Sequence, residues 1–140
     1  MRKYVAGFMF DKNDPNRVAL IHKLKPEWQA GKLNAIGGKI EDDGETRRQA
    51  MVREFREETG FVTQPNEWTR VCTLNGSNFE VHFYAAVGPV DQLRSVEEEQ
   101  VAVYATECVT DENAIPNLTW LLPVAKLVLA GKSQVLEVTQ

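Results

Sequence analysis

The stretch Gly37–Phe61, GGKIEDDGETRRQAMVREFREETGF, places a glycine pair, a short loop and a carboxylate-rich segment in one continuous span. Residues 45–59 contain no proline or glycine, and a glycine follows them as a helix-ending residue. At about 100° of rotation per residue, Glu54, Glu57 and Glu58 fall on one face of such a helix, beside an apolar stripe. We therefore predict a helix over residues 45–59 that packs on one side and is acidic on the other.

Three carboxylates at this spacing repel one another, so their grouping needs a reason. A solvated helix face would pair them with neighbouring arginines. Alternatively, a hard divalent cation such as Mg²⁺ or Mn²⁺ would bind them, because these ions prefer carboxylate oxygens and keep water or phosphate as further ligands. Gly38 allows close backbone approach and offers a carbonyl to the same ion, and Lys39 adds a phosphate-seeking charge. From the glutamates alone, the solvated face is the better interpretation.

The order of the residues favours the metal site. Nine positions resemble the signature of the Nudix hydrolase family, G-x5-E-x7-R-E-U-x-E-E-x-G-U. They are Gly38, Glu45, Arg53, Glu54, Phe55, Glu57, Glu58, Gly60 and Phe61. Six residues rather than five separate Gly38 from Glu45, whereas the later spacing is intact. We assign the extra residue to the loop 41–44, since insertions in loops are well tolerated.

The resemblance implies an α/β fold, the Nudix-type α/β/α sandwich with a mixed sheet. The residue pattern agrees, because apolar, β-branched and aromatic runs alternate with turn residues and with one further helical segment. We predict strands at 3–10, 17–24, 34–40, 68–74, 79–87, 101–108 and 134–138, and a second helix at 118–130.

Composition limits the partners. A chain of 140 residues with 43% hydrophobic residues predicts a single domain over residues 1–140. The net charge of -4 argues against a nucleic-acid polymer or an anionic membrane as partner, and no apolar run is long enough for a membrane span. Cys72 and Cys108 lie in strand-like contexts, which favours buried thiols in the cytosol over a disulfide framework. Both a monomer and a homodimer are compatible with the sequence.

The resemblance also implies the metal site. Mg²⁺, or Mn²⁺, would be held by Glu54, Glu57 and Glu58, which are the expected catalytic residues. A fourth glutamate comes from a loop in such proteins, and Glu99 fits best, with Glu98 second. Glu54 is the expected general base, or the carboxylate that orients the attacking water, although a loop glutamate takes that role in some members. Glu45 is expected to pair with Arg53.

Substrate contacts are predicted at four positions. Lys23 and Lys39 are candidates for phosphate binding. Asn34 precedes the glycine pair, and its amide offers the donors and the acceptor that match a purine edge. Asn117 opens the second helix, where it acts either as an N-cap or as a base contact. A fifth residue, Trp28, either stacks on a planar ligand or covers the edge of the core.

The segment GKLNAIGGK at residues 31–39 looks like the branch of the family that cleans or adjusts nucleotide pools, including the MutT-like diphosphatases of oxidised purine nucleoside triphosphates. We therefore expect hydrolysis of a nucleoside triphosphate to a monophosphate and pyrophosphate. One alternative is a pyrophosphatase for another nucleoside diphosphate derivative, such as ADP-ribose or a dinucleotide. The other is a nucleotide-sensing module without turnover. The presence of every glutamate of the family signature disfavours this alternative.

Overall fold

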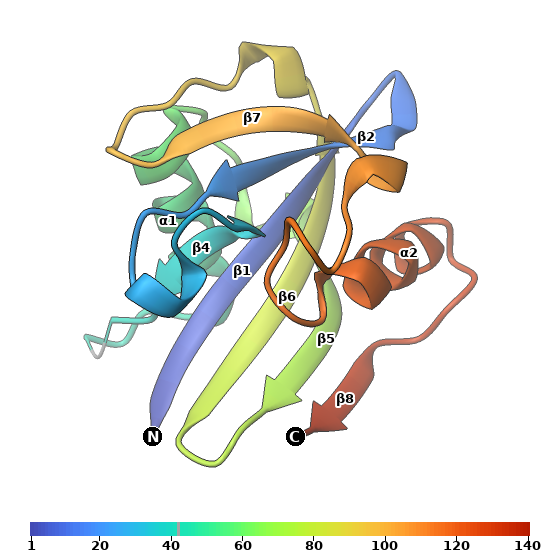
Figure 1. Ribbon diagram of the computed structural model, residues 1–140. Helices are drawn as coiled ribbons and strands as arrows, with labels where there is room; N and C mark the ends of the chain where they lie inside the picture. Colours follow the sequence, from blue (N-terminus) through green and yellow to red (C-terminus); the bar gives the residue numbers. More distant parts are fainter. Residues whose placement is uncertain (42) are drawn as a thin grey trace.

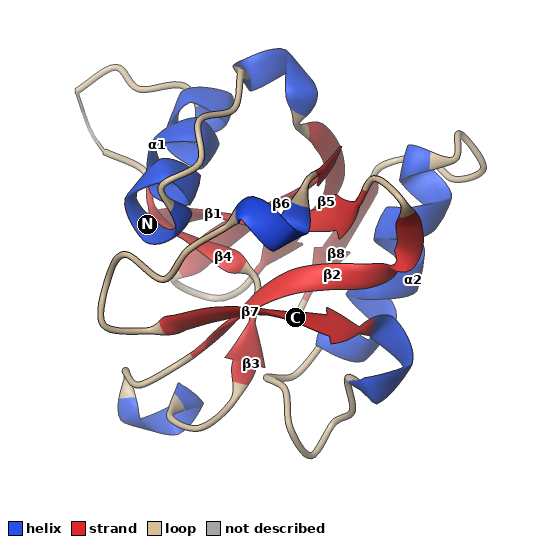
Figure 2. Ribbon diagram, turned by 90° about the horizontal axis from the view of Figure 1, so that it is seen from above, coloured by secondary structure: helices blue, strands red, loops and turns tan. Residues whose placement is uncertain are grey.

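The computed structural model describes residues 1–41 and 43–140, and in this part of the chain a mixed sheet lies between two helices (Figures 1 and 2). The strand order is β3-β2-β1-β6-β5-β8, with β4 and β7 pairing β1 and β2. Their bounds are β1 (Arg2–Asp11), β2 (Asp14–His22), β3 (Leu33–Asn34), β4 (Ile36–Lys39), β5 (Thr69–Asn75), β6 (Phe79–Gly88), β7 (Gln100–Ala105) and β8 (Leu136–Thr139). The predicted α/β fold with a mixed sheet is confirmed.

The two helices cover opposite faces of the sheet, as the view from above shows (Figure 2). α1 (Arg47–Thr59) contributes Met51 and Phe55 to one buried cluster, and α2 (Leu118–Leu129) contributes Leu118 and Leu121 to the other. β1 lies at the centre, parallel to β6 and antiparallel to β2 and β4. Pairing with β1 brings the Gly37–Gly38 segment of β4 to the same face as α1. Neither helix is long and apolar enough to cross a membrane, among the residues described.

α1 begins two residues later than predicted, because Thr46 caps it. The Thr46 hydroxyl accepts from the Gln49 amide at 3.1 Å, and the Gln49 side chain accepts from the Thr46 amide at 2.8 Å. This reciprocal capping box satisfies donors that the first turn leaves free. Gly60 ends the helix in the left-handed conformation, with φ of 74°, as its position predicted.

Three local predictions differ from the structure. The predicted strand 34–40 is divided into β3 and β4, because β3 pairs with β2 whereas β4 pairs with β1. The predicted strand 101–108 ends at Ala105, where a 3-10 turn begins. Cys108 therefore lies exposed, contrary to the prediction, whereas Cys72 is buried. Within the loop 41–44, to which we assign the extra residue, Asp42 lies outside the described residues, and Gly44 has φ of 90°.

Trp68 links α1 to the sheet. Its side chain is 1% exposed, its ring lies edge-on to Phe55 with 5.1 Å between centroids, and its Nε1 donates to the buried Thr63 hydroxyl at 2.8 Å. Burial of a large ring together with a satisfied N–H stabilises the contact between helix and sheet. Trp28, in contrast, is 66% exposed, so the interpretation that it covers the edge of the core is wrong.

We expect Trp68→Ala to lower the free energy of unfolding by about 3–5 kcal/mol, because it removes a buried ring and leaves a cavity. Trp28→Ala is the matched control and should change stability by less than about 0.5 kcal/mol, as exposed positions do. Urea denaturation of both variants measures the difference. Equal losses would show that Trp68 does not hold α1 on the sheet.

Candidate active site

One guanidinium organises the acidic face of α1. Arg53 donates from Nε and Nη2 to the two carboxylate oxygens of Glu45, at 2.7 and 3.0 Å, which confirms the expected pair. Its Nη1 donates to Glu54 at 2.9 Å and lies 3.3 Å from Glu57. Nη2 also donates to the backbone carbonyl of Lys39 at 3.0 Å. The hydrogen bond with Glu45 is the main reason why the pKa of Arg53 is raised, so the guanidinium stays charged.

Glu54 is held against the glycine pair. A Cβ atom added at Gly38 would overlap the Glu54 carboxyl group, so only glycine permits this approach. The Glu54 side chain is 12% exposed. Burial raises its pKa, and the ion pair with Arg53 offsets only part of this effect. The site thus contains a desolvated carboxylate at a place where the backbone of β4 comes close.

Glu58 carries the clearest sign of an unmet interaction. Its Oε2 atom is buried and has no hydrogen-bond partner among the described residues. Burial, followed by the charges of Glu54 and Glu99, raises the pKa of Glu58 to about 7. A buried carboxylate oxygen without a donor is costly, and a cation at this position would remove the cost.

The donor set fits a hard divalent ion without forming a complete cage. In the ranges 1–41 and 43–140, no three carboxylate, imidazole or thiol groups already converge as a metal-binding cluster. Glu57 lies beside Arg53 and is 48% exposed. Glu54, which lies next to the backbone of Gly38, and Glu58 nevertheless act on each other through their charges from one helix face. Mg²⁺ suits such a set, because it takes one or two carboxylates and completes its shell with water and phosphate.

Glu99 and Lys23 bind each other. Glu99 accepts from Lys23 Nζ at 2.8 Å and from the amides of Leu24 and Lys25 at 2.6 and 3.2 Å. Burial alone would raise the pKa of Glu99, but these hydrogen bonds lower it overall. The predicted metal ligand and the predicted phosphate contact therefore neutralise each other in this structure.

The loop before β7 brings this pair towards the helix. The amides of Arg94 and Val96 donate to the carbonyls of Thr59 and Glu58, at 3.0 and 3.1 Å. Sequence reasoning missed the Lys23–Glu99 pair. Register is the signal that would have found it, because His22 of β2 opposes Gln100 of β7, which sets Lys23 beside Glu99.

Of the remaining predicted substrate contacts, Lys39 adjoins this face, whereas the side chain of Asn34 is bound by its own neighbours. Lys39 is exposed, with its carbonyl bound by Arg53. Asn34 donates to Gln29 Oε1 at 3.0 Å and accepts from the Ala35 amide at 2.7 Å, so its amide group is already engaged.

The predicted N-cap at Asn117 is wrong. This residue has φ of 81° rather than an extended backbone, and its side chain makes no capping bond. Its Oδ1 instead accepts from the indole of Trp120 and from Gln140 Nε2, both at 2.9 Å. The alternative interpretation, contact with a base, would require replacement of these two donors.

The raised pKa of Glu58 makes stability depend on pH in metal-free buffer. Because the folded pKa of about 7 exceeds the unfolded value, the folded protein binds the proton more tightly, and stability falls as pH rises between the two values. Glu58→Gln should therefore stabilise the protein on the order of 1 kcal/mol at pH 8 relative to pH 4.5, after allowance for solvent screening. Denaturation in EDTA at both pH values measures this.

Glu57→Gln makes the same chemical change at an exposed position of the same helix and should lack the gain at pH 8. Addition of Mg²⁺ should stabilise the parent more than Glu58→Gln, by mass action. A Glu58→Gln protein without any pH-dependent gain would show that the Glu58 carboxylate is not strained.

Comparison with known proteins identifies related chains. The 8-oxo-dGTP diphosphatase of Escherichia coli (strain K12) is 38% identical over 64 residues, which are 46% of this chain and 49% of that protein. This chain thus matches about half the length of that curated relative.

Solved structures show the same fold. A MutT structure described for Aliivibrio salmonicida and Vibrio cholerae has a TM-score of 0.67 at 25% identity, over 92% of this chain and 96% of that chain. The NUDIX domain of Shewanella oneidensis NrtR, complexed with ADP ribose, has a TM-score of 0.75 over 91% of this chain and 87% of that chain. At 19% identity, this second likeness shows the fold alone. The model of the NUDIX domain matches residues 1–133, and the chain therefore belongs to the Nudix family.

Proposed function

We propose that this protein is a divalent-metal-dependent hydrolase that cleaves a nucleoside triphosphate to a nucleoside monophosphate and pyrophosphate. The observation that carries the proposal is the buried, unpartnered Oε2 of Glu58 on the same helix face as Glu54, which lies against Gly38. Nudix hydrolases generally use divalent metal ions. Mg²⁺ is the ion we propose here, with Mn²⁺ as a substitute, because the donors are carboxylate and backbone oxygens.

The ion would be held by Glu54, Glu57, Glu58 and the backbone at Gly38. Bound there, it would supply charge neutralisation for phosphate oxygens and a lowered pKa for the attacking water. Glu57 would have to turn from Arg53 towards the ion, which its exposure permits. The guanidinium of Arg53 would retain its hydrogen bond with Glu45 and so keep its position when Glu57 turns away.

Glu54 is our candidate for the general base. Its carboxylate is oriented by Arg53 and desolvated, and the raised pKa makes it a better proton acceptor than an exposed glutamate. Arg53 thereby acts as a positioning residue for Glu54. Lys39 is exposed beside the glycine pair and can reach a phosphate, whereas Lys23 would first have to leave Glu99.

Substrate choice rests on the relatives. The similarity to an 8-oxo-dGTP diphosphatase supports an oxidised purine deoxynucleoside triphosphate as the substrate. Asn34 and Asn117 are our candidates for the base contacts. A second candidate is hydrolysis or sensing of a nucleoside diphosphate derivative, since a domain of the same fold is complexed with ADP ribose.

Glu54→Gln should lower kcat by about 10²-fold or more while the fold is retained, because it removes the proton acceptor and a metal ligand without changing side-chain size. Glu107→Gln, which alters an exposed glutamate remote from α1, is the matched control and should retain full activity. Steady-state kinetics with Mg²⁺ measures both. Near-normal turnover in folded Glu54→Gln would assign the base to another residue.

A panel of guanosine, adenosine and oxidised-guanine triphosphates together with ADP-ribose tests the reaction itself. Release of pyrophosphate and a monophosphate from a triphosphate supports the proposal. Turnover of ADP-ribose alone would assign the second candidate. Saturable nucleotide binding with no product would identify a sensing module.

A further inference from the structure

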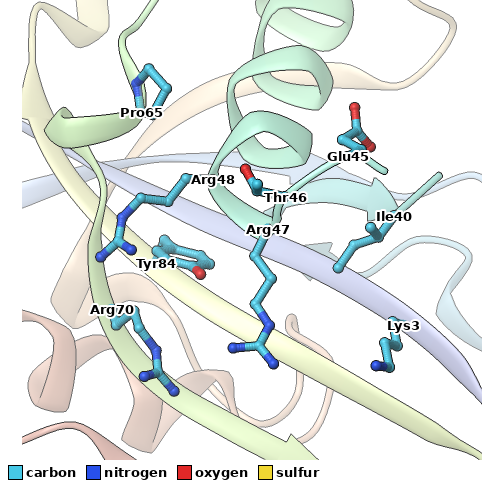
Figure 3. A pocket seen from close by; sticks show the side chains of 9 residues that line it. All are labelled: Lys3, Ile40, Glu45, Thr46, Arg47, Arg48, Pro65, Arg70 and Tyr84. Carbon is cyan, nitrogen blue, oxygen red and sulfur yellow. The ribbon is translucent and has the colours of Figure 1, made fainter. Parts of the chain in front are cut away.

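A hollow lies on the same face of the sheet as α1, at the N-terminal end of the helix (Figure 3). Its volume is about 690 Å³. Lys3 of β1, Arg47 and Arg48 of α1, and Arg70 of β5 line it, with Tyr84 of β6 on its floor. We call this hollow the basic cleft. Of the four signature glutamates, Glu45 lines it, whereas Glu54, Glu57 and Glu58 do not, so the cleft is distinct from the acidic face of α1.

The basic cleft gathers cations in one place, although the chain as a whole has a net charge of -4. Figure 3 shows the guanidinium of Arg47 between Arg70 and the amino group of Lys3. Among residues 1–41 and 43–140, these three side chains take part in none of the ion pairs. The acidic lining residue, Glu45, is already bound by Arg53. The cleft therefore keeps an uncompensated positive potential.

Arg48 has a structural role that distinguishes it from the other cations. Its Nε donates to the carbonyl of Trp68 at 3.0 Å, and its guanidinium lies 5.3 Å from the centroid of the Tyr84 ring. Arg48 thus packs on Tyr84 and forms part of the floor of the cleft. Arg47, Arg70 and Lys3 remain as the groups that face the open space.

The buried side chain of His82 is subject to the charges of the same three cations. It is 2% exposed, and its Nε2 lies 3.0 Å from Glu80 but outside hydrogen-bonding geometry. Burial lowers its pKa, and the charges of Arg47, Arg70 and Lys3 lower it further against the opposing effect of Glu80. Three cations from three elements thus act on one buried ring.

The charges on α1 oppose its macrodipole. A helix favours acidic side chains in its first turn, but α1 has none there and begins with Arg47 and Arg48. Its first amides have no acceptor within the helix, and they add to the positive potential at this end. Helix stability therefore does not account for Arg47, whereas an anionic ligand would.

We propose that the basic cleft binds the phosphate chain of an oligophosphate, either inorganic triphosphate or the phosphates of a second nucleotide. Guanidinium groups bind phosphate oxygens in a bidentate manner, and several cations spread around a hollow of this size match a chain of phosphates better than one small anion. This site goes beyond the proposed hydrolysis and does not depend on it.

Calorimetric titration of the full chain with inorganic triphosphate in EDTA tests the proposal. Without metal, the acidic face repels the anion, so binding reports the cleft. Arg47→Gln combined with Arg70→Gln should weaken binding by about tenfold or more, because two charged donors are lost. Lys12→Gln combined with Lys132→Gln removes the same charge from exposed positions elsewhere and should have little effect. Equal weakening in both pairs would overturn the proposal in favour of general charge attraction.

Two further measurements test the binding site without relying on the glutamine pair, which could misfold, or on catalytic activity. Arg47→Lys combined with Arg70→Lys retains the charge but loses the bidentate geometry, and should therefore weaken binding less than the glutamine pair does. Amide chemical shifts should change at residues 46–48 and 70 on titration, whereas changes confined to residues 38 and 58 would place the anion in the candidate active site and overturn the proposal. Tighter binding of a short oligonucleotide than of triphosphate would also overturn it.

The same titration with a nucleoside triphosphate separates the two sources. Binding about tenfold tighter than that of inorganic triphosphate would assign a second nucleotide, because the nucleoside then adds contacts. Equal affinity would assign the phosphate chain alone.

Discussion

The acidic face of α1 depends on the guanidinium of Arg53. Glutamates one turn apart repel one another, and Arg53 offsets this repulsion for Glu45, Glu54 and Glu57 together. Its bond to the carbonyl of Lys39 also ties the helix to β4, so that Glu54 stays against Gly38. Glu58, which Arg53 does not reach among the described contacts, is the carboxylate left with an unpartnered oxygen. Among the described residues of this acidic face, the carboxylate without compensation is therefore Glu58.

Glu45 lies between two regions of opposite charge. It accepts from Arg53 on the acidic side and lines the basic cleft on the other. The first turn of α1 thus carries Arg47 and Arg48 and no acidic side chain, which is the reverse of the arrangement that its macrodipole favours. Such an arrangement is typical of binding surfaces, because residues selected for ligands are not placed for helix stability.

The helix and its acidic face could be predicted because their signals are local. The spacing of Glu54, Glu57 and Glu58 and the position of Gly60 need no knowledge of the sheet. Features that depend on strand pairing could not be predicted. The Lys23–Glu99 pair and the convergence of Lys3, Arg47 and Arg70 arise from register between distant segments. The N-cap prediction at Asn117 failed for a different reason, since a helix-opening asparagine caps a helix only when its backbone is extended.

Glu58 and Glu99 differ in their suitability as metal ligands, because they differ in the hydrogen bonds that each already accepts. Glu99 accepts from an ammonium group and two amides, and bonds of this kind contribute about 1–3 kcal/mol each to the state that contains them. Binding of a cation by Glu99 would sacrifice part of that set, whereas Glu58 Oε2 has no bond to lose. Lys23, held by Glu99, also lowers the pKa of Glu58 against the larger effect of burial. Energetically, Glu99 is therefore better suited to holding Lys23 beside the site, and Glu58 to binding the ion.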